Sequence, residues 1–326
     1  LEEINFRIQT DGKLKVVNNQ LVIEGNLSEI EKGISEFIIE PFYQSKERKE
    51  RMLLSILENE KLTLDQFSDM FKVSRSTVFS DIELVKSDLL HEGVELEYLK
   101  GYMVSGNEWK IRDIYLQLLS LMEFDFDRID DRIIQFNLKN ELNLSDYSLF
   151  YLNELIDFIN KRNQLGHYVS CDLHQEDLTL DVSGLLSSDH DDEKMYLNAY
   201  IRSLTTMTGK EVPTMVARYV KALLSRVRVS LAVDVLWDDY FINNLENHLI
   251  ASFYRIKYGF PAINMSLTDI KVKYFYLYLS LKNVIVALDN HEVLSQMRDE
   301  EIGFVAAYIG GYLYDMESDE SLKHKV

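Results

Sequence analysis

The stretch from Leu62 to Val104 constrains the fold more than any other part of the sequence, because it predicts four elements in a fixed order. Thr63 and Gln66 have the spacing of a capping box, in which each side chain satisfies a backbone N–H group at a helix start. The apolar positions that follow share one helical face: Leu64, Phe67 and Phe71. A short helix is therefore expected to begin here.

A second helix is expected directly after the first. Lys72 and Val73 interrupt the pattern, and Ser74 is a residue type that caps helix starts. The next apolar positions form a single stripe: Val78, Ile82 and Val85. Residues 94–99 and 102–104 then flank Lys100-Gly101, which predicts a hairpin with glycine at its tip. Helix, turn, helix and hairpin in this order predict a winged helix-turn-helix.

The outer face of the second predicted helix carries the side chains that such a motif presents to the major groove of DNA. We expect DNA contacts from this face and from the hairpin tip: Arg75, Ser76, Thr77, Phe79, Ser80, Lys86 and Lys100. Any helical bundle can contain two short helices joined by a tight turn, and it is the following hairpin that favours DNA binding.

Length and composition predict several mainly helical domains. The chain has 326 residues, enough for two or more cores, and 46% hydrophobic residues with 13 Gly and 3 Pro favour long helices. Cys171 is the single cysteine, so no disulfide can form within the chain, which suits a reducing cytosol. No apolar run approaches the roughly 18 residues of a membrane span. We therefore expect a cytoplasmic protein with no membrane contact.

The negative charge is unevenly distributed. The formal net charge is −19, of which −4 lies in residues 1–44, −2 in residues 45–112 and −13 beyond residue 112. Binding that coats nucleic acid without sequence preference needs clustered Lys and Arg. The near-neutral segment 45–112 instead predicts sequence-selective DNA binding, helped by dimerisation, with weak non-specific affinity.

Residues 1–25 resemble a second copy of the end of the same motif. Residues 14–26 can be aligned with residues 96–107 with little adjustment, including a polar turn. We interpret this as an internal repeat, in which residues 1–8 end a first recognition helix and the hairpin is its wing. Chance similarity of two amphipathic hairpins is the alternative. Because Leu1 lies within an expected helix, the chain is expected to be part of a longer protein.

The remaining sequence predicts helices throughout. Residues 27–42 predict a connecting helix that Pro41 ends. The clearest later helices are expected over residues 147–160, 194–204, 214–227 and 240–258. We therefore expect a mainly α-helical chain: a remnant of a first winged motif with a connector over residues 1–44, a winged helix-turn-helix over 45–112, and helical bundles over 113–212 and 213–326.

The seven histidines are the first candidates for catalysis or metal binding, and they form no ligand motif. The sequence lacks a His-Glu-x-x-His pair, a partner for Cys171, a P-loop, a dinucleotide fingerprint and a nucleophile elbow. His167 and His174 lie in a polar segment and are expected on a loop surface. We predict no metal, no cofactor and no catalytic residue, and the chain is not expected to be an enzyme.

His248 stands apart because of its position on the helix predicted over residues 240–258. Asn244, His248, Ser252 and Arg255 line a polar stripe beside the apolar one, so the imidazole is expected to be accessible. A neutral imidazole is a competent phosphoryl acceptor, and Arg255 is placed to pair with the phosphate charge. A surface histidine without a function is the alternative that periodicity leaves open.

The sequence from His248 onward resembles the phosphotransferase-system regulation domain, known as PRD. Separated blocks carry the similarity in the same order: His248-Leu249-Ile250, Arg255 to Asn264, Asp269 to Tyr274, and Glu300 to Gly310. Together with the predicted winged helix-turn-helix, the chain resembles PRD-containing transcription regulators of the LicR, MtlR and Mga kind over about residues 1–318. This resemblance implies two helical PRD bundles, binding to double-stranded DNA, a homodimer, and control by the phosphocarrier HPr or enzyme II components.

The resemblance also implies phosphoacceptor histidines. His248 falls on the first acceptor position of the second PRD, and Tyr308 occupies the later one. In the first PRD, Glu154 and Tyr200 take the two positions. His248 is therefore the expected phosphorylation site and Arg255 the expected phosphate-pairing residue. We favour the first PRD as a structural spacer over the alternative that the Glu154 carboxylate stands in for phosphate.

Two other functions stay open at the level of sequence. PRDs also occur in RNA-binding antiterminators, but those carry a small β-rich RNA domain where this chain has a predicted recognition helix and wing. A protein-interaction regulator with decayed DNA contacts would fit the few basic residues around Arg75.

Overall fold

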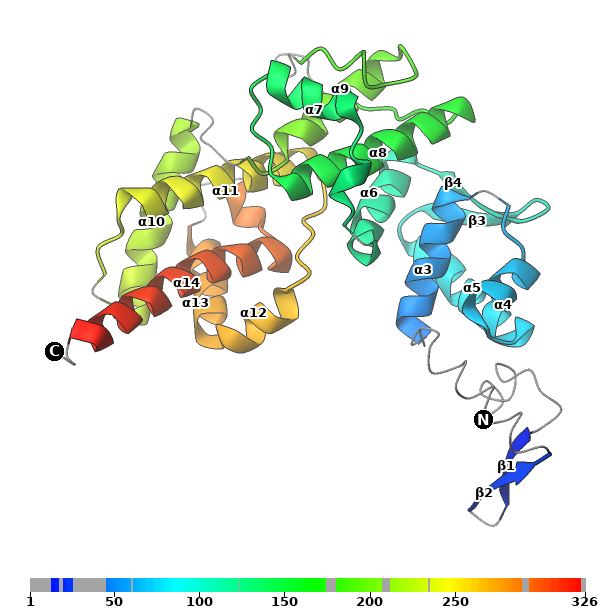
Figure 1. Ribbon diagram of the computed structural model, residues 1–326. Helices are drawn as coiled ribbons and strands as arrows, with labels where there is room; N and C mark the ends of the chain where they lie inside the picture. Colours follow the sequence, from blue (N-terminus) through cyan, green and yellow to red (C-terminus); the bar gives the residue numbers. More distant parts are fainter. Residues whose placement is uncertain are drawn as a thin grey trace. The chain divides into compact units, whose positions relative to one another are not determined.

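The computed structural model describes residues 13–17, 20–25, 45–59, 61–122, 124–173, 180–206, 212–233, 235–288 and 293–323. The chain divides into two compact units, Leu1–Leu121 and Met122–Val326. The described chain is mainly α-helical, as expected (Figure 1). None of its helices in these ranges is long and apolar enough to cross a membrane.

The first unit contains the predicted winged helix-turn-helix. Its elements are α3 (Ser45–Glu58), α4 (Leu64–Phe71), α5 (Arg75–His91), β3 (Val94–Tyr98), β4 (Tyr102–Gly106), α6 (Glu108–Leu118) and η1 (Leu119–Leu121). The capping box is present, because Thr63 N–H donates to Gln66 Oε1 at 2.9 Å and Gln66 N–H donates to Thr63 Oγ1 at 3.4 Å. Ser74 caps α5 by accepting from Thr77 N–H at 3.2 Å. The predicted helix starts are confirmed.

The wing is a hairpin extended by the chain before α4. β3 and β4 pair antiparallel, and Tyr102 also exchanges backbone hydrogen bonds with residues 61–62, at 2.8 Å to Leu62 O and 3.1 Å from Lys61 N–H. Gly101 has φ 149°, and a Cβ there would lie 1.9 Å from Lys61 O, so only glycine fits. The predicted hairpin is confirmed, except that Leu99 belongs to the turn.

A buried ion pair joins α3 to the recognition helix α5. Arg48 Nε donates to Asp81 Oδ2 at 2.6 Å, and both side chains are almost fully buried. Apolar side chains of α3, α4 and α5 are fully buried in the same unit, including Met52, Phe67 and Val78. These contacts set the orientation of α5 within the unit.

The hairpin predicted near the start of the sequence is also present. β1 (Lys13–Val17) and β2 (Gln20–Glu24) pair antiparallel, with Val17 opposite Gln20. The other features predicted here, a first recognition helix over residues 1–8, the turn at Asn18-Asn19 and the connecting helix over residues 27–42, lie outside the described residues.

The second unit consists of two groups of helices. The first bundle contains η2 (Phe126–Arg128), α7 (Asp131–Lys139), α8 (Asp146–Gln164) and α9 (Asp191–Arg202). The second bundle contains α10 (Thr214–Leu231), α11 (Asp239–Tyr258), α12 (Leu267–Lys273), α13 (Phe275–Ala287), η4 (Leu294–Gln296) and α14 (Asp299–Lys323). The four helices predicted most clearly are confirmed as α8, α9, α10 and α11.

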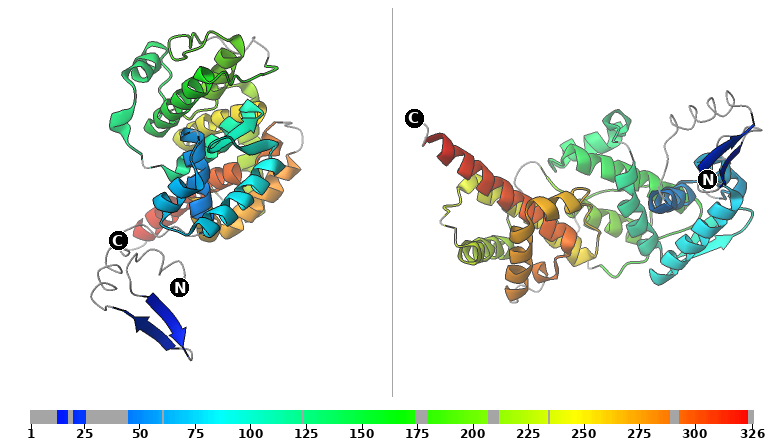
Figure 2. Two further views of the ribbon diagram at one scale, coloured as in Figure 1. Left: turned by 90° about the vertical axis from the view of Figure 1, so that its right-hand side faces the viewer. Right: turned by 90° about the horizontal axis from the view of Figure 1, so that it is seen from below.

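The second bundle packs α14 against α11, α12 and α13, while α10 lies against α11 and α13 (Figures 1 and 2). Its core is apolar and fully buried at Leu223, Leu249, Leu281 and Val305. Gly310 lets α14 pack closely against Tyr274, because a Cβ at this position would lie 2.5 Å from the ring of Tyr274. The first bundle joins the second through contacts of α9 with α11.

Candidate functional site

The N-terminal part of α5 presents an exposed polar face. Arg75 is the first residue of this helix, and its side chain is 66% exposed while its Nε pairs with Asp65 Oδ1 at 3.1 Å. Ser76 and Ser80 are exposed beside it, and Phe79 is 53% exposed. Thr77 is partly buried, and its Oγ1 lies 2.9 Å from Ser74 Oγ. Thr77 thus belongs to the helix cap. Arg75, Ser76, Phe79 and Ser80 share the exposed face of α5.

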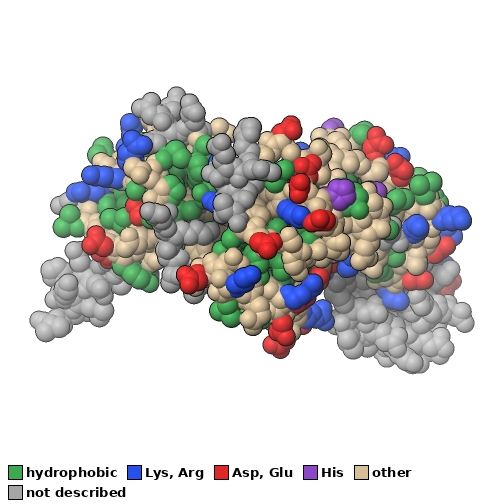
Figure 3. Space-filling model, turned by 90° about the horizontal axis from the view of Figure 1, so that it is seen from above, with side chains coloured by type: hydrophobic (Ala, Val, Ile, Leu, Met, Phe, Trp, Pro, Cys, Tyr) green, Lys and Arg blue, Asp and Glu red, His purple; other side chains and the backbone are tan. Residues whose placement is uncertain are grey.

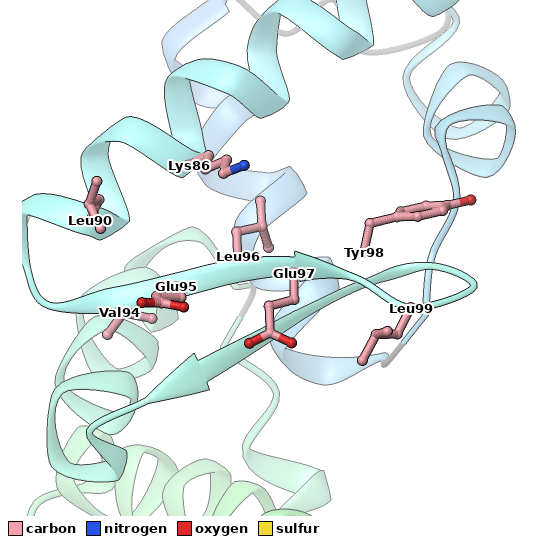
Figure 4. Close-up of a pocket in the computed structure, with 8 residues that line it drawn as sticks. All are labelled: Lys86, Leu90, Val94, Glu95, Leu96, Glu97, Tyr98 and Leu99. Carbon is pink, nitrogen blue, oxygen red and sulfur yellow. The ribbon is translucent and has the colours of Figure 1, made fainter.

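Lys86 and Lys100 lie elsewhere on the same unit. Lys86 and Leu90 project from α5 beside β3, where they line a cavity of about 470 Å³ with residues 94–99 (Figure 4). A helix rises about 1.5 Å per residue, so Lys86 lies about 16 Å from Arg75 along the axis. Lys100 is exposed at the wing tip in the left-handed conformation, with φ 63°. The predicted DNA contacts therefore fall into three separate places: the start of α5, its C-terminal half and the wing.

The surface carries both signs of charge. On the face drawn in Figure 3, Asp and Glu side chains are interspersed with Lys and Arg. On this face such a pattern provides no large field of one sign to attract a phosphate backbone. Weak non-specific affinity for nucleic acid stays a prediction.

His248 is buried, so the expectation of an accessible imidazole is wrong. The residue is 5% exposed, and the rings of Phe304 and Tyr308 on α14 pack against it, each with its centroid 5.1 Å from that of the imidazole. The polar stripe of α11 faces α14 instead of solvent. It tolerates burial because α14 supplies a carboxylate, Glu301, opposite this stripe.

Glu301, Arg255 and Ser252 form a buried charge network beside His248. Arg255 makes a two-point contact with the Glu301 carboxylate, with Nε to Oε1 at 2.6 Å and Nη2 to Oε2 at 3.0 Å. Ser252 Oγ donates to Glu301 Oε2 at 2.5 Å. Sequence reasoning missed this role for Glu301, although the residue lies in the last block of the PRD resemblance.

Arg255 also links the two bundles. Its Nη1 donates at 2.9 Å to the carbonyl of Ser203, which ends α9 in the first bundle. A cation at a helix C-terminus is favoured, because carbonyl groups there lack partners within the helix. The predicted phosphate-pairing residue is thus already engaged, by one carboxylate and one carbonyl.

The imidazole is neutral at physiological pH. Burial and the nearby charge of Arg255 lower the pKa of His248 from its ordinary 6.5 to about 4, against a smaller opposing effect of Glu301. His248 Nε2 lies 3.9 Å from Glu301 Oε2, too far for a hydrogen bond, and it has no hydrogen-bond partner among the residues that the structure describes. Burial disfavours ionisation of Glu301, but the charge and hydrogen bonds of Arg255, together with the other groups around the carboxylate, outweigh this effect and hold the pKa of Glu301 below its usual value.

A cavity of about 880 Å³ opens between the bundles of the second unit, with His248 and Arg255 in its lining. Tyr200 and Tyr308, which occupy the two later acceptor positions of the PRD resemblance, both line it as well. Glu154 is half-buried and accepts from Asn153 Nδ2 at 3.2 Å, and burial raises its pKa. Among the residues that the structure describes, no group of His, Cys, Asp or Glu is arranged to hold a metal ion.

A winged helix-turn-helix with an exposed recognition face, joined in one chain to helical bundles with a buried charge network, defines a DNA-binding regulator with a helical control unit. Family models identify both parts: the Mga helix-turn-helix domain matches residues 33–119 and the PRD domain matches residues 221–312. The chain is thus a PRD-containing regulator similar to those of the Mga and LicR kind. The PRD match includes His248, Arg255 and Glu301. Comparison with curated proteins found no match.

Proposed function

We propose that this protein is a cytoplasmic transcription regulator whose DNA binding is controlled by phosphorylation of His248, with HPr or an enzyme II component of the sugar phosphotransferase system as the donor. The observation that supports this most is the environment of the imidazole. It is neutral, its Nε2 has no hydrogen-bond partner in the described part of the chain, and it adjoins the arginine that ties the two bundles together. A modification there would act directly on the junction between the two bundles.

The proposed reaction is a transfer between two imidazoles. The lone pair of His248 Nε2 attacks the phosphorus of the donor phosphohistidine, so that one N–P bond forms as the donor's breaks. The product carries on the order of two negative charges at neutral pH. These charges would adjoin Glu301, whose carboxylate lies 3.9 Å from Nε2 in the unmodified protein.

Arg255 is the group that would respond to the new charge. Two anions would compete for one guanidinium, and the phosphate offers it a stronger hydrogen-bond acceptor. Reorientation toward the phosphate removes the contact with Glu301, with Ser203, or with both. Because Ser203 belongs to the first bundle, we propose that phosphorylation changes the packing of the two bundles.

The burial of His248 adds a condition to this proposal. A donor protein must bring its phosphohistidine to a nitrogen that α14 covers, so the rings of Phe304 and Tyr308 must first move aside. Phosphorylation would then occur only after the junction between the two bundles has opened, and it would keep that junction open. In the homodimer that we propose, this change repositions two winged units on DNA, with Arg75, Ser76, Phe79 and Ser80 at the major groove.

The test is phosphoryl transfer in a reconstituted system. The chain is incubated with phosphoenolpyruvate, enzyme I and HPr, with and without enzyme II components, and analysed by intact and peptide mass spectrometry under conditions that preserve phosphohistidine. We expect one phosphoryl group on the His248 peptide. His248→Ala should abolish it, whereas His190→Ala, which changes an exposed histidine of the first bundle, should not.

This proposal would be refuted if phosphotransferase components of demonstrated activity transferred no phosphoryl group to His248. The PRD would then be a scaffold, and the regulating signal would have another origin.

A protein-interaction regulator with decayed DNA contacts is the second candidate. One observation favours it: the guanidinium of Arg75 pairs with Asp65 within the same unit. Exposed ion pairs of this kind are weak, so DNA phosphates would compete with Asp65 easily. An RNA-binding antiterminator is less compatible with the recognition helix and wing, and preference for duplex DNA over hairpin RNA separates the two.

A further inference from the structure

The cavity between the two bundles has the dimensions of a small-molecule site. Its volume of about 880 Å³ lies within the range of roughly 300–1,000 Å³ that is usual for such sites. Its walls come from α8 and α9 of the first bundle, and from α11, α14 and the loop over residues 260–266 of the second. A molecule bound there would contact both bundles at once.

Aromatic rings dominate its lining: Phe124, Tyr147, Tyr151, Tyr200, Phe304 and Tyr308. Phe124 contacts Tyr147 edge-on at a centroid distance of 4.6 Å, and it contacts Tyr151 at 5.8 Å. The faces and edges of aromatic rings favour another planar ring at such distances. The lining therefore suits a flat, largely apolar body.

Two serine hydroxyl groups of the lining are already used by the fold. Ser148 Oγ donates to the carbonyl of Thr205, and Ser203 Oγ donates to that of Tyr200. These two hydroxyl groups are therefore not free to donate to a ligand.

His248 provides the polar contact. Its Nε2 is buried beside the rings of Phe304 and Tyr308, which also line the cavity, and it has no hydrogen-bond partner among the described residues, so a bound molecule reaches it once those rings move aside. A buried nitrogen without a partner is destabilising, and a ligand atom within the cavity would relieve this. A neutral imidazole can offer either a donor or an acceptor at this position, depending on its tautomer.

The cavity also selects against charge. Among the described residues that line it, Arg255 is the one permanent cation, and no Asp or Glu is present. Glu301, which is not among the lining residues, already neutralises Arg255 and accepts two hydrogen bonds from it. A free anionic ligand would have to compete with Glu301 for Arg255, and a cationic one would find no counter-charge among the described residues of the lining.

From these observations we propose that the cavity binds an uncharged aromatic molecule of one or two fused rings, held among the rings of both bundles and hydrogen-bonded to His248 Nε2. Its occupation stabilises one packing of the bundles, so it is a second input to the regulator. The proposal concerns the unmodified chain and does not require phosphorylation of His248. Failure of either proposal can thus be recognised without the other.

The test uses two pairs of compounds that differ only in a polar group: indole with 1-methylindole, and isoquinoline with naphthalene. Binding to the full chain is measured by ligand-observed NMR titration, and the state of His248 by ¹⁵N-histidine spectra. We expect at least one polar member to bind roughly 3- to 10-fold more tightly than its apolar twin, as one hydrogen bond would give. The Nε2 resonance of His248 should shift with that compound.

Two variants and a control locate the site. His248→Gln should reduce the advantage of the polar compound and remove the shifted resonance. Ile263→Trp, which places a large ring in the lining, should weaken all four compounds, and His190→Gln should change none. Circular dichroism checks that each variant is folded.

Three outcomes overturn the proposal. They are the absence of binding by all four compounds, binding that Ile263→Trp leaves unchanged, and binding of glucose or inorganic phosphate in preference to the aromatic compounds.

Discussion

At the scale of single residues, Arg255 has the most consequential position. It contacts a carboxylate of its own bundle and a carbonyl of the other, and its charge helps to keep His248 neutral. A surface arginine would exchange such partners freely with water. Here burial makes each contact costly to break, and this coupling lets a change at one side chain alter the packing of two bundles.

Removal of Arg255 should show this coupling in the free energy of unfolding. Arg255→Met leaves Glu301 buried without its counter-charge, which we expect to destabilise the second unit by about 3–5 kcal/mol. The double variant with Glu301→Gln should recover part of this loss, because no uncompensated charge remains. Urea unfolding followed by Trp237 fluorescence in a Trp109→Phe background reports on this unit. Equal destabilisation of the single and double variants would contradict the prediction.

His248 should make the stability of the second unit depend on pH. Its pKa is about 4 in the folded chain, below the ordinary 6.5, so between these values the unfolded chain binds a proton that the folded chain does not. Stability should therefore fall as the pH decreases from 6.5 to 4, by up to about 3 kcal/mol, and be unaffected by this group above pH 6.5. His248→Gln should remove this part of the slope, as measured by urea unfolding at pH 7.5 and 5.0. An unchanged slope would mean that the imidazole is hydrated.

At the scale of elements, the position of the wing depends on a close approach between the backbones of Gly101 and Lys61. β4 pairs with residues 61–62 as well as with β3, and Gly101 lies where the backbones meet. Gly101→Ala should displace the wing tip, because its Cβ would overlap Lys61 O. We expect a loss of at least 1 kcal/mol in the stability of the first unit, of the order of a strained backbone position, and weaker binding to DNA. Gly184→Ala, in the second unit and where a Cβ meets nothing within 4 Å, is a control for the substitution itself and should leave the first unit unchanged.

The recognition helix offers a separate test. Arg75→Ala should weaken binding to the operator by roughly 5- to 100-fold, the effect of about 1–3 kcal/mol for a contact to a base edge. Its folding should be little affected, because the exposed pair with Asp65 contributes little. Lys110→Ala, on α6, is a control that removes a basic residue outside the predicted face. Promoter occupancy that survives Arg75→Ala would favour the interaction regulator with decayed DNA contacts.

At the scale of the whole molecule, two inputs meet at one junction. Phosphorylation of His248 would draw Arg255 away from the partners that hold α9, and an aromatic ligand would fill the space between the same helices. These two effects are opposed if the ligand stabilises the closed packing of the bundles, which phosphorylation would open. Hydrogen exchange of α9 should then increase on phosphorylation and decrease with the aromatic ligand that binds, which can be measured by mass spectrometry. A change in the same direction for both would contradict an antagonistic arrangement.

Local interactions account for what could be inferred from the sequence. The capping box, the Ser74 cap, the glycine at the wing tip and the apolar stripes depend on residues within a few positions of each other, so their pattern predicted α4, α5, the wing and helices α8 to α11. The blocks after His248 likewise identified the PRD. Such features are encoded in spacing, because a helix or hairpin brings together residues at set intervals.

The environment of His248 depended on partners distant in the chain. Periodicity placed the imidazole on a polar stripe of α11, but Glu301 is 46 residues from Arg255 in sequence and Ser203 is 52. Only the packing of α14 and α9 against α11 brings these groups together, buries the stripe and leaves a cavity beside it. Exposure is a property of the assembled helices, since a polar face can be buried wherever another helix supplies the matching charge.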